Sequence, residues 1–186
     1  KNKLIIERQE LKDILLLKPK IYHDERGYFF ESFKENLLEE FGLSLKFVQD
    51  NEVHSNNARI IRGLHYQLGK QQGKLVHVVA GAIKDIAVDV RTNSPDFGKS
   101  IAVELDSKSH NMLFIPEGFA HGYLVMKNNT IVHYKCTNYY DPNSEYGIFW
   151  NDKDLNIDWG ISNPILSKKD NKLPMLKDQV NLPSFL

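Results

Sequence analysis

The sequence has 186 residues, of which 41% are apolar, and its 24 basic side chains are balanced by 24 acidic ones. We therefore expect one globular domain over residues 1–186, with no nucleic acid or membrane surface as a partner. The single cysteine, Cys136, excludes an internal disulfide and a cysteine-based zinc site. Apolar runs such as residues 14–17 are too short to cross a membrane, and no signal-peptide pattern opens the chain, so we expect a cytoplasmic protein.

In chain order, the first predicted element is a helix over residues 33–41. Phe33, Leu37 and Phe41 repeat at helical spacing, and Gly42 follows where such a helix ends. We expect this segment to form a small helical flank beside the rest of the domain.

Most of the remaining chain predicts short strands rather than helices. Segments rich in β-branched and aromatic residues alternate with turn residues, and these segments are 75–79, 83–90, 100–105, 112–115, 122–126 and 130–135. Short, evenly spaced strands favour an all-β sandwich or barrel over a parallel α/β sheet. The chain from about residue 151 is more polar and contains three prolines, so we expect a loop-rich tail that wraps the barrel.

The segment IRGLHYQ at 61–67 contains the first candidate functional group. Strand alternation predicts Arg62 on one face and Gly63 and His65 on the other. Glycine beside the histidine leaves room for a ligand next to the imidazole. Taken alone, His65 is more often a satisfied histidine in a barrel wall than a functional one.

A second candidate, Lys74, opens the apolar strand that follows QG at 72–73. Its ammonium group can point into the mouth of a barrel, where it would bind phosphate or stabilise an oxyanion. The alternative is a lysine that protects the edge of a sheet from aggregation, and for a lone lysine that alternative is the more common.

The segment Pro116-x-Gly118-x-x-His121 resembles the second motif of the cupin superfamily, whose turn places a histidine inside the barrel. Metal-binding cupins add a His-x-His pair, but here that position reads His65-Tyr66-Gln67. Two separated histidines make a poor metal site, since three or four converging ligands are required. Metal binding is therefore the minority interpretation.

Three further side chains remain open when taken one at a time. Tyr134 and Tyr140 fit either packed core aromatics or functional groups, and Asp170 fits either a functional group or a tail residue that is solvated or caps a turn. We expect Cys136 to be a small buried residue rather than a nucleophile.

Taken together, eight segments resemble the dTDP-4-dehydrorhamnose 3,5-epimerase family of the cupin superfamily. They follow the family's order over nearly the whole chain: DERGYFFESF (24–33), FVQDNE (47–52), IRGLHYQ (61–67), QGKLV (72–76), DIAVDVRTNSPDFG (85–98), IPEGFAHGY (115–123), YKCTNYYDPNSEYGIFWND (134–152) and LSKKD (166–170). The resemblance implies a double-stranded β-helix, the jelly-roll barrel of the cupins. It also implies a homodimer that exchanges N-terminal strands.

The same resemblance assigns roles to individual residues. His65 resembles the catalytic base, Asp170 its orienting partner, Lys74 the cation beside the substrate keto oxygen and Tyr134 the proton donor. The substrate-binding positions are carried over to Arg26, Glu31, Gln49, Asp50, Asn51, Arg62, His121, Tyr140, Glu145 and Lys169. Departures from the family pattern at His77, Ala80, Lys84 and Gly160 touch none of the catalytic positions and bear on specificity.

The implied chemistry suits these residue types. A ketone at C4 of a hexose acidifies the C–H bonds at C3 and C5, so a base, an acid on the opposite face and a cation near the oxygen suffice for inversion. No metal or nicotinamide cofactor is needed for that reaction. The expected substrate is dTDP-4-dehydro-6-deoxy-D-glucose, which leads to the L-rhamnose precursor used in surface polysaccharides.

Two alternatives stay open at this point. One is an epimerase that inverts a single centre, C3 or C5, or acts on another nucleotide sugar. The other is a non-catalytic or metal-binding cupin, against which the missing second histidine counts.

Overall fold

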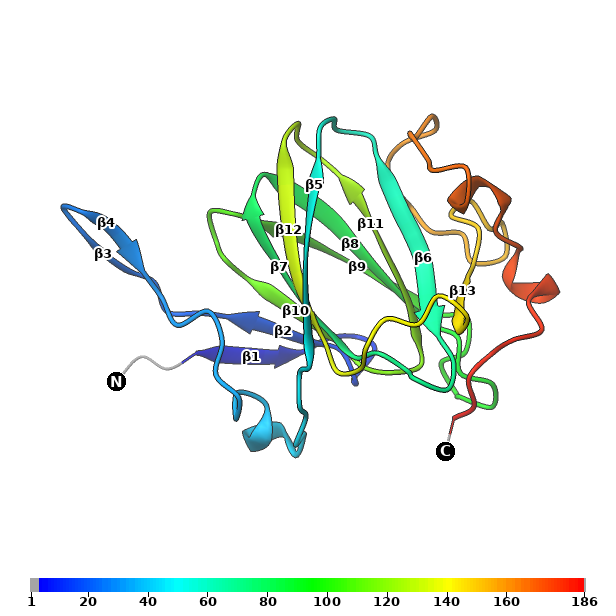
Figure 1. The fold of residues 1–186 in the computed structure, drawn as a ribbon, viewed down its shortest axis with the longest axis horizontal. Helices are drawn as coiled ribbons and strands as arrows, with labels where there is room; N and C mark the ends of the chain where they lie inside the picture. The colour runs from blue at the N-terminus through cyan, green and yellow to red at the C-terminus, as the bar shows by residue number, and fades with distance from the viewer. Residues whose placement is uncertain (1–3, 186) are drawn as a thin grey trace.

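The protein consists mainly of two antiparallel β-sheets that face each other, together with a small hairpin (Figure 1). The structure is a computed structural model, and it describes residues 4–185. The six-stranded sheet has the order β1-β2-β10-β7-β12-β5, the five-stranded sheet has the order β13-β6-β11-β8-β9, and β3 pairs with β4 alone. No helix within residues 4–185 is long and apolar enough to span a bilayer.

The strands run over the following residues: β1 Ile5–Arg8, β2 Leu15–Lys18, β3 Tyr22–Asp24, β4 Gly27–Phe29, β5 Gln49–Ser55, β6 Ile61–Gln67, β7 Lys74–Ala80, β8 Ala82–Asp89, β9 Ser100–Asp106, β10 Met112–Ile115, β11 Phe119–Val125, β12 Thr130–Cys136 and β13 Glu145–Gly147. Short 3₁₀ helices lie at Glu39–Phe41, Asp170–Lys172 and Leu176–Asp178. The all-β jelly roll expected from the sequence is thus confirmed, and each of the six predicted strands is present with small shifts at its ends.

The predicted helix over residues 33–41 is wrong. Only a single 3₁₀ turn forms at Glu39–Phe41, and Gly42 ends it in the left-handed conformation with φ of 76°. The segment is too short to form a stable helix by itself. Instead, Phe33, Leu37 and their apolar neighbours pack against the outer face of the six-stranded sheet, and this packing determines the backbone path.

The interior between the sheets is apolar. Side chains of both sheets, including Val76, Val78, Ile83, Ala87 and Val132, form the central core cluster. Inward side chains lie two residues apart along β7 and β12, so Lys74 and Tyr134, at the same inward positions, also face the interior. This alternation places the functional side chains discussed below.

The outer face of the five-stranded sheet is covered by the chain that follows β13. Trp150, Leu155 and Trp159 from this chain pack against Leu64 and other outward residues of the sheet. Figure 1 shows this segment running beside β6 and β13 to the C-terminus. It therefore brings residues 165–170 next to β6.

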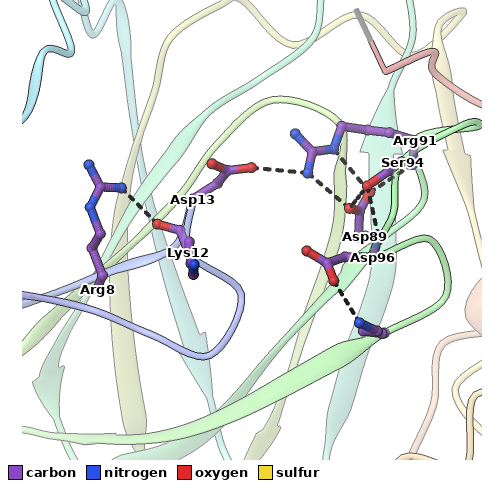
Figure 2. Close-up of polar contacts among 8 residues, drawn as sticks. Arg8, Lys12, Asp13, Asp89, Arg91, Ser94 and Asp96 are labelled. Carbon is purple, nitrogen blue, oxygen red and sulfur yellow. Dashed lines mark hydrogen bonds and ion pairs between the residues drawn. The ribbon is translucent and has the colours of Figure 1, made fainter.

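A charged cluster around the buried Asp89 joins distant parts of the chain, and Figure 2 shows its contact with Asp13. Asp89 is fully buried at the end of β8 and accepts hydrogen bonds from Arg91 Nε at 3.0 Å and Ser94 Oγ at 2.6 Å. Arg91 also reaches Asp13 at 3.1 Å, and its guanidinium lies 4.8 Å from the centroid of the Phe185 ring. Burial by itself raises the pKa of Asp89, but these bonds lower that pKa overall. The cluster fastens the N-terminal and C-terminal segments to the barrel.

Candidate active site

A cavity of about 430 Å³ lies between the two sheets and the C-terminal tail. Apolar side chains such as Val53 and Ile165 form part of its wall. The polar groups in the wall come from four strands and the tail, and they are Arg62, His65, Lys74, His121, Tyr123, Tyr134, Ser167, Lys169 and Asp170. The four side chains proposed from the sequence as catalytic therefore surround a single cavity.

His65 is held by a buried carboxylate from the tail. Its Nε2 atom lies 2.6 Å from Oδ1 of Asp170, which is 4% exposed. The second carboxylate oxygen of Asp170 accepts a hydrogen bond from the backbone N–H of Gly63 at 3.1 Å. Burial alone raises the pKa of Asp170, but the hydrogen bond and charge of His65 outweigh burial and lower that pKa. The carboxylate orients the imidazole and leaves Nδ1 available for proton transfer.

Lys74 and Tyr134 face the same cavity from the other sheet. The Lys74 ammonium lies 5.9 Å from the centroid of the Tyr134 ring, and it forms no hydrogen bond or ion pair with residues 4–185. Burial lowers the pKa of Lys74 and raises the pKa of the Tyr134 hydroxyl to about 12. A desolvated cation without a partner is suited to an oxyanion that develops during a reaction. The tyrosine is protonated at neutral pH and can donate its proton.

The two groups suited to proton transfer thus come from opposite walls. His65 belongs to β6 of the five-stranded sheet and Tyr134 to β12 of the six-stranded sheet. Facing sheets pack about 10 Å apart, which is close to the space that a sugar ring and its contacts occupy.

Arg62 lies in the same cavity as His65, so the predicted alternation is wrong here. Along β11, His121 pairs with His65 and Tyr123 pairs with Arg62. Two steps along β11 therefore match three steps along β6, and the extra residue on β6 turns Arg62 to the side of His65. Gly63 lies within this irregularity with φ of 111°, and a Cβ there would come within 2.6 Å of the His121 carbonyl oxygen. Only glycine fits.

His121 faces the barrel interior, as the Pro-x-Gly-x-x-His pattern predicted. Its Nε2 atom lies 2.6 Å from Oδ1 of Asp85, and both residues are buried. Asp85 is a functional residue for which the sequence predicted no role. The available signal was a carboxylate in the middle of the apolar strand Ala82–Asp89, because such a group is buried only when it has a partner.

Several of the proposed substrate-binding residues form a hydrogen-bonded group that joins the cavity through Lys169, which lines it. Glu145 forms an ion pair with Lys169 and accepts a hydrogen bond from the Tyr140 hydroxyl at 3.0 Å. Burial raises the pKa of Glu145, but the hydrogen bond from Lys169 lowers that pKa overall. Gln49 accepts a hydrogen bond from the Tyr140 backbone at 2.9 Å and donates one to Asn51 at 3.1 Å. The Tyr140 ring is 50% exposed and can stack on a flat ligand group.

Three other proposed residues, Arg26, Glu31 and Asp50, have exposed side chains and do not line the cavity. Arg26 lies on the β3–β4 hairpin, pairs with Asp24 and is 85% exposed, and Figure 1 shows this hairpin projecting away from the barrel. Glu31 follows the same hairpin and is exposed. The Asp50 side chain is exposed and pairs with Lys135 at 3.0 Å, because alternation along β5 turns it away from the cavity-lining Val53.

The remaining candidate chemistry concerns metal ions and the cysteine. Within residues 4–185, no group of three or more His, Cys, Asp or Glu side chains is arranged to hold a metal ion. Cys136 is buried, as predicted, and burial raises the pKa of its thiol. A buried, protonated thiol is a poor nucleophile.

Comparison with known proteins identifies relatives of the whole chain. Residues 8–178 match the family model described as dTDP-4-dehydrorhamnose 3,5-epimerase. The dTDP-4-dehydrorhamnose 3,5-epimerase of Shigella flexneri is 47% identical over 165 residues, covering 88% of this chain and 91% of that protein.

Two solved structures are similar to this chain in their three-dimensional fold. The dTDP-6-deoxy-D-glucose-3,5-epimerase of Legionella pneumophila, in complex with dTDP-4-keto-L-rhamnose, has a TM-score of 0.94 and 42% identity, covering 98% of this chain and 99% of that one. A 3'-monoepimerase from Streptomyces bikiniensis, in complex with dTDP-quinovose, has a TM-score of 0.88 and 28% identity, covering 95% and 91%. With its family model, its close relatives and its cavity in agreement, this chain belongs to the dTDP-4-dehydrorhamnose 3,5-epimerase family.

Proposed function

We propose that this protein converts dTDP-4-dehydro-6-deoxy-D-glucose into dTDP-4-dehydro-L-rhamnose by inverting C3 and C5. The observation that carries the proposal is the placement of His65 and Tyr134 on opposite walls of one cavity, with Lys74 between the sheets. Inversion requires removal of a proton from one face of a carbon and its return to the other face. Two groups on a single wall would return the proton to the face from which it came.

In the proposed reaction, Nδ1 of His65 takes the proton from a carbon next to the C4 ketone. The electron pair of the broken C–H bond forms the enolate, whose negative oxygen is stabilised by the Lys74 ammonium. Asp170 stabilises the imidazolium that forms. Tyr134 then donates its hydroxyl proton to the opposite face of the same carbon, and the ketone is restored. The imidazolium loses a proton to solvent and the tyrosinate takes one up, so the pair is reset before the second carbon is inverted.

The pattern of charge fits an anionic nucleotide sugar. Arg62 and Lys169 supply positive charge at the wall and rim, and Arg62 offers forked donors suited to a diphosphate. The exposed ring of Tyr140 supplies a surface for the nucleotide base. The Legionella relative was solved with dTDP-4-keto-L-rhamnose, which supports the same ligand class here.

We further propose a homodimer in which each chain receives the β3–β4 hairpin of the other. The hairpin carries the exposed apolar side chains Tyr22, Tyr28 and Phe29 together with Arg26, and Figure 1 shows it projecting away from its own barrel. Within its own chain Arg26 lies outside the cavity, so its proposed substrate contact requires a second copy. Sedimentation of the purified protein should give twice the chain mass.

The direct test is solvent exchange followed by ¹H NMR in D₂O. Wild-type protein should incorporate deuterium at C3 and C5 of dTDP-4-dehydro-6-deoxy-D-glucose, and His65→Ala should lose at least about 10²-fold in both exchange rates. Exchange at one carbon alone would favour the single-centre alternative represented by the Streptomyces monoepimerase. No exchange by wild type, or equal exchange by His65→Ala, would contradict the proposal.

A further inference from the structure

The Tyr123 hydroxyl is a buried polar group in the cavity wall that has no assigned role. The Tyr123 side chain is 4% exposed, and its hydroxyl forms no hydrogen bond with residues 4–185. Burial raises the pKa of this hydroxyl, so it remains a donor at neutral pH. A buried hydroxyl without a partner is destabilising and is rare in folded proteins.

A second buried polar atom without a partner lies on the neighbouring strand. Oδ2 of the fully buried Asp85 accepts no hydrogen bond, although Oδ1 of the same carboxylate is 2.6 Å from His121 Nε2. Tyr123 on β11 is paired directly with Asp85 on β8. Directly paired residues project to the same face with their Cβ atoms about 4.5–5.5 Å apart. An unsatisfied donor and an unsatisfied acceptor therefore project from paired positions of neighbouring strands to the same face of the five-stranded sheet.

We propose that Tyr123 is a positioning residue, whose hydroxyl is linked through one buried water to Oδ2 of Asp85 and so holds the Asp85–His121 pair in place. A water here has two polar partners in addition to the cavity groups around it, which is what buried waters in proteins require. The result is a continuous chain of hydrogen bonds from Tyr123 to the imidazole of His121. Tyr123 itself does not exchange protons with the substrate.

The consequence for the site is that Tyr123 should influence binding rather than proton transfer. His121 is the proposed substrate-binding residue at the end of the chain, whereas the proposed base and acid, His65 and Tyr134, are held by other contacts. The inference thus rests on the proposed function and extends it. Other charged groups facing His121 across the cavity are Arg62 from β6, Lys74 from β7 and Lys169 and Asp170 from the tail, and none of them contacts Oδ2 of Asp85.

The test is Tyr123→Phe, which removes only the hydroxyl, with Tyr66→Phe as a matched control. The Tyr66 hydroxyl is also buried, but it donates to the Asn181 carbonyl at 2.6 Å and lies outside the cavity. We expect Tyr123→Phe to raise KM about two- to tenfold, as for the loss of one ordinary hydrogen bond, and to keep kcat within about twofold. Both variants should lower Tm by roughly 1–4 °C, but Tyr66→Phe should leave KM unchanged.

The sign of the Tm change separates the water-linked hydroxyl from an unsatisfied one. A hydroxyl without any partner would make Tyr123→Phe neutral or stabilising, and that result would overturn the inference. An unchanged KM would overturn it as well. The double variant Tyr123→Phe/Asp85→Asn should raise KM little beyond Asp85→Asn alone. If the two substitutions instead raise KM independently, so that their effects multiply, the proposed chain of hydrogen bonds is contradicted.

Two readouts keep this inference distinguishable from the proposed function. If wild-type protein shows no solvent exchange, the proposed function fails whatever the variants do. If wild type is active and Tyr123→Phe matches it, only the role of Tyr123 fails. A crystal structure of wild type should show an ordered water between Tyr123 Oη and Asp85 Oδ2, and this check does not depend on activity.

Discussion

Replacing Asp170 by Asn tests whether the tail carboxylate sets the proton position on His65. The change keeps the size of the side chain but removes its charge, at a site where Asp170 is 4% exposed and lies 2.6 Å from His65 Nε2. A hydrogen bond that involves a charged group contributes about 1.5–3 kcal/mol. Its loss alone corresponds to roughly a 10- to 10²-fold effect on the reaction.

The exchange rate of Asp170→Asn should fall further than this, because the substitution also changes the tautomer of the His65 imidazole. An amide NH₂ turned toward Nε2 places the imidazole proton on Nδ1, which is the atom proposed as the base. In a carboxylate–histidine pair that loses its charge in this way, activity falls by up to about 10⁴-fold. For Asp170→Asn we expect exchange rates about 10²- to 10⁴-fold below wild type.

The same variant has a predicted pH signature in stability. The pKa of Asp170 is lowered in the folded state, so its stabilising contribution is complete above its unfolded pKa of about 3.9 and is lost as the pH falls through the lower folded value. Asp170→Asn should therefore be less stable than wild type at pH 7, and the difference should shrink in acid below about pH 4. Urea unfolding over this pH range measures it.

Asp152→Asn is the matched control for this experiment. Asp152 is also a buried carboxylate of the C-terminal segment, and it accepts a hydrogen bond from the Leu176 backbone at 2.6 Å, but it lies outside the cavity. The Asp152→Asn variant should be less stable than wild type but should keep the wild-type exchange rate. The reasoning about Asp170 is refuted if Asp170→Asn exchanges within about threefold of wild type, or if Asp152→Asn loses exchange equally.

Three other changes test separate parts of the structure. Tyr134→Phe should keep C–H exchange but lower complete inversion by about 10²-fold or more in the NMR assay, and equal turnover would argue against Tyr134 as the acid. Arg91→Lys cannot keep the forked contact with Asp89 or the stacking on aromatic rings, so we expect unfolding by urea to show a loss of about 1–3 kcal/mol with unchanged activity per folded molecule. Gly63→Ala places a Cβ within 2.6 Å of a backbone oxygen at φ of 111°, and it should cost about 2–4 kcal/mol and most of the activity. Normal stability and turnover of Gly63→Ala would show that the backbone adapts there.

The sequence was most informative where structure depends on local pattern. Strand periodicity predicted the barrel strands because alternation of side chains is a property of the extended backbone. The resemblance of Pro116-x-Gly118-x-x-His121 to a cupin motif predicted the inward direction of His121, and the structure confirms it. The resemblance to the epimerase family rested on eight short segments, each readable without knowledge of its neighbours in space.

Local pattern failed where packing between distant segments decided the outcome. The residues around Phe33 have helical spacing, but their apolar side chains pack on a sheet formed far along the chain, and only one 3₁₀ turn remains. Arg62 lies beside His65 because β6 carries one more residue than its partner β11 over this stretch. That irregularity depends on the pairing of two strands; Gly63 within β6 is a local signal of a bulge, but it does not show which residues of the two strands are opposite each other.

The sequence by itself determined the fold class, the family and the kinds of chemical groups available. Only the tertiary structure decided which of those groups meet. His65 and Asp170 are 105 residues apart, yet their side chains lie 2.6 Å apart, and Asp85 holds His121 across two paired strands. Neither contact follows from periodicity, because a residue's spacing along the chain fixes the face on which it lies but not the partner that covers it. Closure of the barrel supplies that partner. A chain with no net charge therefore has a cavity in which the cation Lys74, the carboxylate Asp170 and the imidazole His65 occupy separate positions.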